Sequence, residues 1–297
     1  MRGFLIVLII VILAFVAWAF FVQCGGKTPC TTDQIFPPTE QPAPEPTPDP
    51  EPTPDPEPTP DPTPDPQPDP QPDPQPDPTP EPPKDPNGNT FKFEPAGKLL
   101  AGSGTGVETE TIYAPGMRYP TEVAPSFPNS QVYMRGGYLG PAGGQCDAQN
   151  YSYPWRDNFC EKRSWDTSLC PGAKGHQGQD IRPATCQKGV HWAVAAEAGQ
   201  ITNIGSYTIT LTADSGIRYR YLHLKMDALA VALGDTVTRG QRIGFVSNDF
   251  GGASTTIHLH FEIKKSIALA DGTSQIHFVP PYTSLVDSYK RLLAGTP

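Results

Sequence analysis

The clearest pattern in the chain is the alternation of apolar and polar residues in its C-terminal half. Residues 257–263 read IHLHFEI, and similar runs occupy 199–205 (GQITNIG), 208–213 (TITLTA) and 217–224 (IRYRYLHL). A period of two places successive side chains on opposite faces of a strand. Turn signals such as ADSG and GD separate the runs, so we expect antiparallel strands and a mainly β fold. Only the tail from Ser284 (SLVDSYKRLL) has helical spacing.

A different pattern, an unbroken apolar run without a charge, covers residues 4–22. As a helix this run would be about 28 Å long, close to the ~30 Å thickness of a hydrocarbon core. No A-x-A cleavage site follows it, so we interpret it as a retained transmembrane anchor. Residues 1–3 would be a cytoplasmic stub, because positive charge precedes the run, and residues 23–36 a juxtamembrane segment. Lipidation of Cys24 is an alternative, although the residue before it is not small.

Proline dominates residues 37–86, in repeats such as PTPDPEP and QPDP. Proline fixes φ and lacks a backbone donor, so this tract can form neither helix nor sheet. We expect an extended polyproline linker of up to about 150 Å, kept in solvent by its acidic residues. A ligand for an SH3-like domain is the alternative. The tract accounts for the acidity of the chain, because residues 87–297 carry 19 Lys and Arg against 17 Asp and Glu, or +2, whereas the whole chain has −9.

We divide the rest of the chain into a β-rich extension over 87–145 and a main domain over 146–297. This part holds four cysteines: Cys146, Cys160, Cys170 and Cys186. An even number of cysteines beyond a membrane anchor predicts two disulfides in an oxidising compartment, and three pairings are possible. The alternative is a four-thiolate zinc site, but no two of these cysteines form a C-x-x-C pair.

Histidines and one carboxylate supply the candidate chemistry. His176 and Asp180 stand in GHQGQD, where the glycines indicate a loop that leads into a strand, and His258 and His260 share one face of IHLHFEI. These residues offer the nitrogen and oxygen ligands of an open catalytic zinc site. Both histidines of the strand cannot easily bind a zinc already held by His176 and Asp180. One of them is therefore free to act as a base.

A further histidine, His223, lies in the alternating run over 217–224. The chain has no H-E-x-x-H motif, so a histidine has to take the role that glutamate has in thermolysin-type enzymes. The motifs offer no role for His191 and His277, which we expect to be ordinary packing or surface residues.

Four motifs, in this order, resemble those of the lysostaphin-type (LytM-type) zinc endopeptidases, which cut peptidoglycan cross-bridges: GHQGQD, YLHL, GDTVTRGQRIGFV and HLHFE. The resemblance covers about residues 172–265. It implies an antiparallel, β-sandwich-like catalytic domain of the duplicated hybrid motif type. It also implies one Zn²⁺ bound by His176, Asp180 and His260, and a catalytic pair formed by His223 and His258.

The chain departs from this family's pattern in two places. The S-x-F-G-x-R strand that usually precedes the first ligand is at best echoed by residues 129–133 (NSQVY), and a long stretch with three cysteines follows. Ile257 stands where a proline or small residue often precedes H-L-H. These departures concern the shape of the substrate cleft rather than the metal centre.

The implied function is a membrane-anchored endopeptidase that hydrolyses peptide cross-bridges of bacterial peptidoglycan, with zinc-bound water as nucleophile and a histidine as general base. We expect a monomer at the inner (cytoplasmic) membrane, anchored by one helix, with its catalytic domain in the periplasm or another extracytoplasmic space. Its expected partners are the stem peptides and cross-bridges of the wall and the membrane, without nucleic acid. The alternatives are a non-catalytic wall-binding module and an amidase-activating relative of the same fold, which typically lacks the zinc ligands.

Overall fold

The computed structural model describes residues 81–268 and 272–297, which belong to one compact unit, Gln75–Pro297. The predicted anchor, Cys24 and most of the predicted linker lie outside the described residues. Among the helices that the structure describes, none is long and apolar enough to cross a membrane. The folded part begins before the predicted end of the linker, because Lys84 pairs with Thr90 in a β-bridge and Asp85 is buried.

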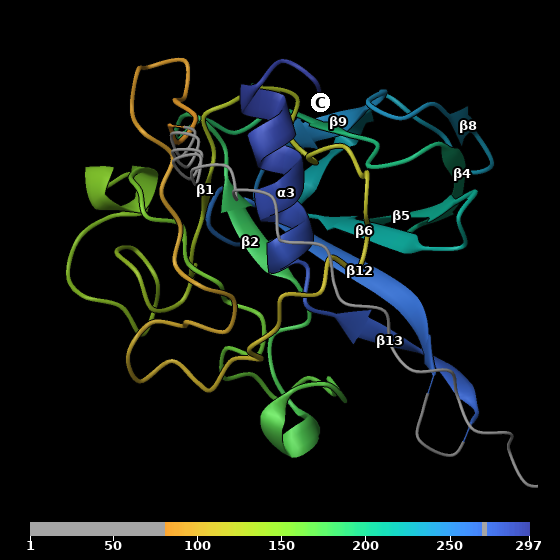
Figure 1. Ribbon diagram of the computed structural model, residues 1–297. Coiled ribbons are helices and arrows are strands. Elements are labelled where there is room, and N and C mark those ends of the chain that lie inside the picture. Colours follow the sequence, from red (N-terminus) through yellow and green to blue (C-terminus); the bar gives the residue numbers. More distant parts are fainter. Residues whose placement is uncertain (1–80, 269–271) are drawn as a thin grey trace, which may run out of the picture. The chain divides into compact units, whose positions relative to one another are not determined.

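Antiparallel sheets dominate the described residues, and this confirms the predicted mainly β class (Figure 1). The largest sheet has the order β1-β2-β12-β6-β5-β4-β8, with β13 paired to the outer part of β12. A second sheet has the order β3-β9-β7, and β10 and β11 form a small hairpin. The strands are β1 Phe127–Pro128, β2 Gln179–Arg182, β3 Trp192–Val194, β4 Gly199–Ile204, β5 Thr208–Ala213, β6 Arg218–Leu222, β7 Leu224–Leu229, β8 Thr236–Val237, β9 Arg242–Val246, β10 Asp249–Phe250, β11 Ala253–Ser254, β12 Leu259–Ala268 and β13 Ser274–Val279.

Helical structure is sparse. The one α-helix of the described residues is α3, Tyr282–Leu293, where the tail has helical spacing. It buries Leu285 and Tyr289 in the main core. Two short 3₁₀ turns, η1 (Ala148–Tyr151) and η2 (Pro171–Ala173), lie in the long stretch between β1 and β2.

The alternating runs form strands because each can bury one face in a shared core. In β12 the apolar residues Leu259, Phe261 and Ile263 have no exposed surface. The same core cluster contains Tyr221 from the largest sheet and Ile243 from the β3-β9-β7 sheet. Burying three such side chains stabilises the fold by several kcal/mol, at about 1.5–3 kcal/mol each.

Residues 87–145 do not form the β-rich extension that we predicted. Among them the structure has one two-residue strand, β1, and otherwise loops and isolated bridges. These loops still contribute Phe91, Met117 and Tyr119 to the main core, beside Trp155. They are therefore part of the same folded body, held by aromatic packing rather than by strand pairing.

The run over 217–224 is also not the single strand that its alternation predicts. Strand β6 ends at Leu222, and β7 begins at Leu224. Between them His223 has a φ of 66°, in the left-handed region. The chain therefore turns at this histidine, which interrupts the period of two.

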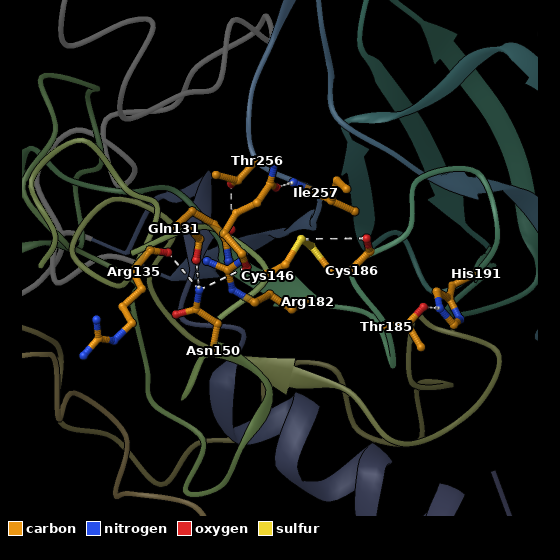
Figure 2. The surroundings of a disulfide bond; sticks show 12 residues. Gln131, Arg135, Cys146, Asn150, Arg182, Thr185, Cys186, His191, Thr256 and Ile257 are labelled. Carbon is orange, nitrogen blue, oxygen red and sulfur yellow. Dashed lines mark hydrogen bonds between the residues drawn. A yellow bond between two sulfur atoms is a disulfide. The ribbon is translucent and has the colours of Figure 1, made fainter. Parts of the chain in front are cut away.

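Two disulfides form within the described part of the chain, as predicted, and they resolve the pairing. Cys146 is joined to Cys186 (Figure 2), and Cys160 to Cys170. The four cysteines are thus not ligands of a metal.

Candidate metal centre

The three predicted ligands come from two neighbouring strands and the loop before one of them. Asp180 in β2 lies directly opposite His260 in β12, because the two strands pair in antiparallel register. His176 stands in the loop that leads into β2. All three side chains are buried, and their candidate ligand atoms lie within 4.8 Å of one another. The structure therefore brings these residues together as a group that could hold a metal ion.

A glycine lets this loop lie against β12. A Cβ at Gly178 would be 2.4 Å from the carbonyl oxygen of Phe261 and 2.9 Å from His260 Nε2. Both distances are too short for any side chain, so a substitution would displace the loop and His176 with it. The glycine in the middle of H-x-G-x-D is a packing requirement of the site.

The spacing of the three groups suits zinc. His176 Nε2 lies 3.2 Å from Asp180 Oδ1, His260 Nδ1 lies 3.0 Å from the same oxygen, and the two nitrogens are 2.9 Å apart. Ligands about 2.0–2.1 Å from a tetrahedral zinc are separated by about 3.3 Å, which a small outward movement of these groups would reach. Two imidazoles and one carboxylate are also the donor types that catalytic zinc sites use, with one position left open.

Asn158 holds two of these residues in place. Its carbonyl oxygen accepts a hydrogen bond from His176 Nδ1 at 2.9 Å, which leaves Nε2 as the free ligand atom. Its side chain donates to Asp180 Oδ2 at 2.9 Å and accepts from the Asp180 backbone N–H at 3.1 Å. Such contacts fix ring orientation and ligand geometry around a metal. The sequence patterns did not indicate Asn158, because it belongs to no motif and lies far from both residues in the chain.

The third candidate ligand, His260, is oriented by a carboxylate on its own strand. His260 Nε2 donates to Glu262 Oε1 at 2.9 Å, so Nδ1 faces Asp180 and His176. Glu262 is buried and is paired with the guanidinium of Arg220 on β6. The glutamate of HLHFE thus has a specific contact, which its alternation with the histidines on one strand face could have suggested.

Electrostatics prepare the group for a cation. Burial alone would raise the pKa of Asp180, but the imidazoles of His176 and His258 outweigh it and hold that pKa well below its usual range. Burial lowers the pKa of His260, yet its hydrogen bonds to Asp180 and Glu262 outweigh burial and raise the pKa to about 9. The carboxylate is therefore ionised at neutral pH, whereas His260 holds a proton that a metal ion has to displace when it binds.

The two predicted catalytic histidines lie beside the ligands. The ring centroids of His223 and His258 are 4.7 Å apart, and His258 Nε2 is 3.4 Å from Asp180 Oδ1. Each ring donates its Nδ1–H to a backbone carbonyl at 2.8 Å, His223 to Asp249 and His258 to Thr256. In both rings Nε2 is therefore the nitrogen that is not held by the backbone. Burial and the nearby imidazoles of His258 and His260 lower the pKa of His223 to about 2, so it stays neutral.

These side chains line a cleft of about 340 Å³. Its further lining includes aromatic side chains that lie far apart in the sequence: Tyr138, Trp165, Tyr207 and Phe250. Trp165 belongs to the loop closed by the Cys160–Cys170 disulfide and is 55% exposed. The cleft can therefore contact a ligand with large planar side chains around the metal centre.

The remaining histidines of the described residues lie outside this cleft. His191 shares a hydrogen bond with Thr185 Oγ1 at 2.7 Å, and His277 shares one with Ser168 Oγ at 2.6 Å. Neither residue lines the cleft.

Comparison with known proteins agrees with this geometry. Residues 174–274 match peptidase family M23, and this segment contains all three candidate ligands and both further histidines of the cleft. The fold and the site together define a class of protein: a mainly β domain that carries a His-Asp-His group in a cleft. This similarity to peptidase family M23 covers about a third of the chain.

Solved structures also show partial similarity. A candidate glycyl-glycine endopeptidase lytM from Ruminococcus gnavus is 28% identical, over 42% of this chain and 48% of that chain, with a TM-score of 0.32. The catalytic domain of the antimicrobial peptidase lysostaphin from Staphylococcus simulans is 26% identical, over 40% and 89%, with a TM-score of 0.28. A zinc-containing peptidase from Vibrio cholerae is 24% identical, over 40% and 34%, with a TM-score of 0.27. The chain thus spans about half the length of the first of these proteins. Among curated proteins, none matches the chain.

Proposed function

We propose that this protein is a zinc-dependent endopeptidase that hydrolyses the peptide cross-bridges of bacterial peptidoglycan. The observation that supports this most directly is the position of two further histidines, His223 and His258, beside the group His176, Asp180 and His260 in one cleft. A group that served only to stabilise the fold would not need two further imidazoles beside it. The match of residues 174–274 to peptidase family M23 supports peptide hydrolysis as the reaction.

The chemistry divides between a metal and the protein. Bound by His176, Asp180 and His260, zinc would supply Lewis acidity toward water and toward the scissile carbonyl. His258 takes the proton of the attacking water on Nε2, because its Nδ1–H is committed to Thr256 O. The imidazolium formed in this way then donates a proton to the leaving amine. His223 accepts a hydrogen bond through its Nε2 beside His258. Because its imidazole is neutral, it adds no positive charge that would oppose metal binding.

The wall as substrate and the location of the protein are also proposals. The apolar run over 4–22 and the proline tract over 37–86 favour a catalytic domain tethered outside the cytoplasmic membrane, where wall peptides are found. The two disulfides support an oxidising compartment such as the periplasm. We propose that the protein acts as a monomer with one zinc.

Incubation of the purified chain with defined cross-linked muropeptides tests this function. The expected result is a product set whose masses show hydrolysis of one cross-bridge bond. A chelator should abolish the reaction, and added Zn²⁺ should restore it. If the zinc-loaded protein binds the muropeptides but leaves them intact, it is a wall-binding or amidase-activating relative instead.

A further inference from the structure

The segment that leads into β12 is held by the backbone at its two ends, where the Thr255 N–H donates to Asn248 O and the His258 N–H to Ser247 O. Pairing of β12 with β2 starts at Leu259, so residues 255–258 lie outside the ladder. The Ile257 N–H instead donates to the side chain of Gln145, at 2.7 Å from Oε1. Gln145 lies outside the segment that matches peptidase family M23, and it does not line the cleft.

The geometry of one peptide unit links Gln145 to the candidate base. The carbonyl of Thr256 and the N–H of Ile257 belong to the same planar peptide group, so they point in opposite directions and rotate together. The N–H is held by Gln145, and the carbonyl accepts the Nδ1–H of His258 at 2.8 Å. A rotation of this plane would withdraw the nearer of the two oxygens that face His258 Nδ1, the other being Thr256 Oγ1 at 3.2 Å, and so disturb the tautomer and the ring direction.

Gln145 is itself held firmly. Its backbone carbonyl accepts from Arg182 Nη1 and from Asn150 Nδ2, both at 3.1 Å. The next residue, Cys146, is joined to Cys186, which follows β2 in the chain, and the two Cα atoms are 5.4 Å apart. Figure 2 shows Cys146, Cys186 and Arg182 close to Ile257.

A second glutamine contacts the same peptide unit from its other residue. Thr256 Oγ1 donates to Gln131 Oε1 at 2.7 Å, a contact drawn in Figure 2, and Gln131 is buried. Gln131 lines the cleft, however, so its substitution could also alter contacts with a ligand. Gln145 does not line the cleft, so its substitution tests the positioning role without altering contacts with a ligand.

We propose that Gln145, anchored by the Cys146–Cys186 disulfide, is a positioning residue that holds the Thr256–Ile257 peptide and thereby directs Nε2 of His258 toward the metal centre. This inference rests on the proposed function, in which His258 is the base. It gives a specific role to the long disulfide-containing stretch between β1 and β2. This stretch fixes the Thr256–Ile257 peptide, on which proton transfer by His258 depends.

Substitution of Gln145 in the full chain tests the proposal. Gln145→Leu has nearly the same size but no acceptor, and we expect kcat on cross-linked muropeptides to fall about 10- to 100-fold, since small displacements of catalytic groups cost this much. KM and zinc content should stay unchanged, because Gln145 touches neither the cleft nor the ligands. Gln145→Glu retains an acceptor and should recover most of the lost kcat. Gln187→Leu, an exposed glutamine beside the same disulfide, is the matched control and should behave like the wild type.

A second measurement does not depend on hydrolysis. NMR of ¹⁵N-labelled histidine should show the Nδ1–H tautomer of His258 in the wild type and a mixture of tautomers in Gln145→Leu. If the leucine variant does not fold, Gln145→Ala takes its place. Wild-type kcat and tautomer in the variant would overturn the proposal, and so would equal loss in the leucine and glutamate variants. A wild type that hydrolyses nothing but shows the tautomer difference would refute the proposed function alone.

Discussion

At the level of single residues, every imidazole of the centre uses one nitrogen for a hydrogen bond to the protein and presents the other to the cleft. His176 is held by the carbonyl of Asn158, His260 by Glu262 and His258 by Thr256. This arrangement separates the two functions that the sequence left open within IHLHFEI. His260 lies within the ligand group, and His258, two residues earlier, lies beside it with its own acceptor.

Removal of single histidines should separate metal binding from turnover. His260→Ala deletes one of three ligands, so we expect it to lose both zinc and activity. His223→Ala leaves the ligands intact and should retain zinc while kcat falls by about 10²-fold or more, the usual contribution of a positioned acid–base group. Zinc per chain by atomic spectroscopy, together with kcat, measures both effects. Retained zinc with full activity in His260→Ala would show that the ligands are assigned wrongly.

The buried Asp157 next to Asn158 gives a prediction about stability and pH. Burial raises the pKa of Asp157 to about 6, although its carboxylate accepts hydrogen bonds from the N–H groups of Gly97 and Phe159. The pKa of Asp157 in the folded state lies above its unfolded value of about 3.9. The contribution of this group to the free energy of unfolding is therefore greatest below pH 4 and is lost as the pH rises through about 6. The loss from this group is about 3 kcal/mol. Asp157→Asn does not titrate, so its free energy of unfolding should lack this decline.

Urea unfolding at several pH values between 4 and 7 measures the difference between the two proteins. Other groups titrate in both, so only the difference reports on Asp157. A difference that does not change over this range would mean that the carboxyl group has an ordinary pKa in the folded state.

At the level of elements, the period of two predicted β4, β5 and β12 well because each strand buries one face in the core. It failed where a functional residue breaks the pattern. The run over 217–224 continues its alternation in sequence, but His223 adopts a left-handed backbone between β6 and β7. It failed again over 87–145, where loops are held by aromatic contacts between distant residues, which leave no local period.

The same limit explains the parts of the site that the sequence did not reveal. The group of candidate ligands could be predicted because H-x-x-x-D and H-x-H place donors at short spacings on a loop and a strand. The contacts of Asn158 and Gln145 cross long sequence separations and use common polar residues, so no local pattern marks them. The register that sets His260 opposite Asp180 likewise exists only once β2 and β12 pair.

The left-handed backbone at His223 predicts that this residue lowers the stability of the fold while its imidazole serves activity. A non-glycine residue there costs roughly 1–2 kcal/mol, which glycine avoids. We therefore expect His223→Gly to be more stable than His223→Ala by about 1 kcal/mol, although both lack the imidazole and turn over slowly. Thermal or urea unfolding of the two variants makes this comparison. Equal stability would show that the backbone at this position relaxes without the histidine.

At the level of the whole molecule, acidity and catalysis belong to different parts of the chain. The carboxylates that make the chain acidic are concentrated before residue 87, whereas the folded remainder has a net charge near zero. The folded part is instead stabilised by a core that includes side chains from loops between residue 91 and residue 155. Two disulfides close to the site add to this stability. One of them closes the loop whose residues Cys160 and Glu161 exchange backbone hydrogen bonds with His176.

We therefore expect stability and activity to depend on an oxidising compartment, in which the two disulfides persist. Reduction of both should lower the free energy of unfolding by several kcal/mol, since loops of these lengths contribute about 3 and about 4 kcal/mol in the chain-entropy estimate. Zinc affinity should also fall, because the backbone of His176 depends on the loop at Cys160. Paired serine variants separate the contributions: Cys160→Ser with Cys170→Ser should weaken zinc binding more, and Cys146→Ser with Cys186→Ser should lower kcat more. Reduced protein with unchanged stability and zinc affinity would mean that the fold needs no oxidising compartment.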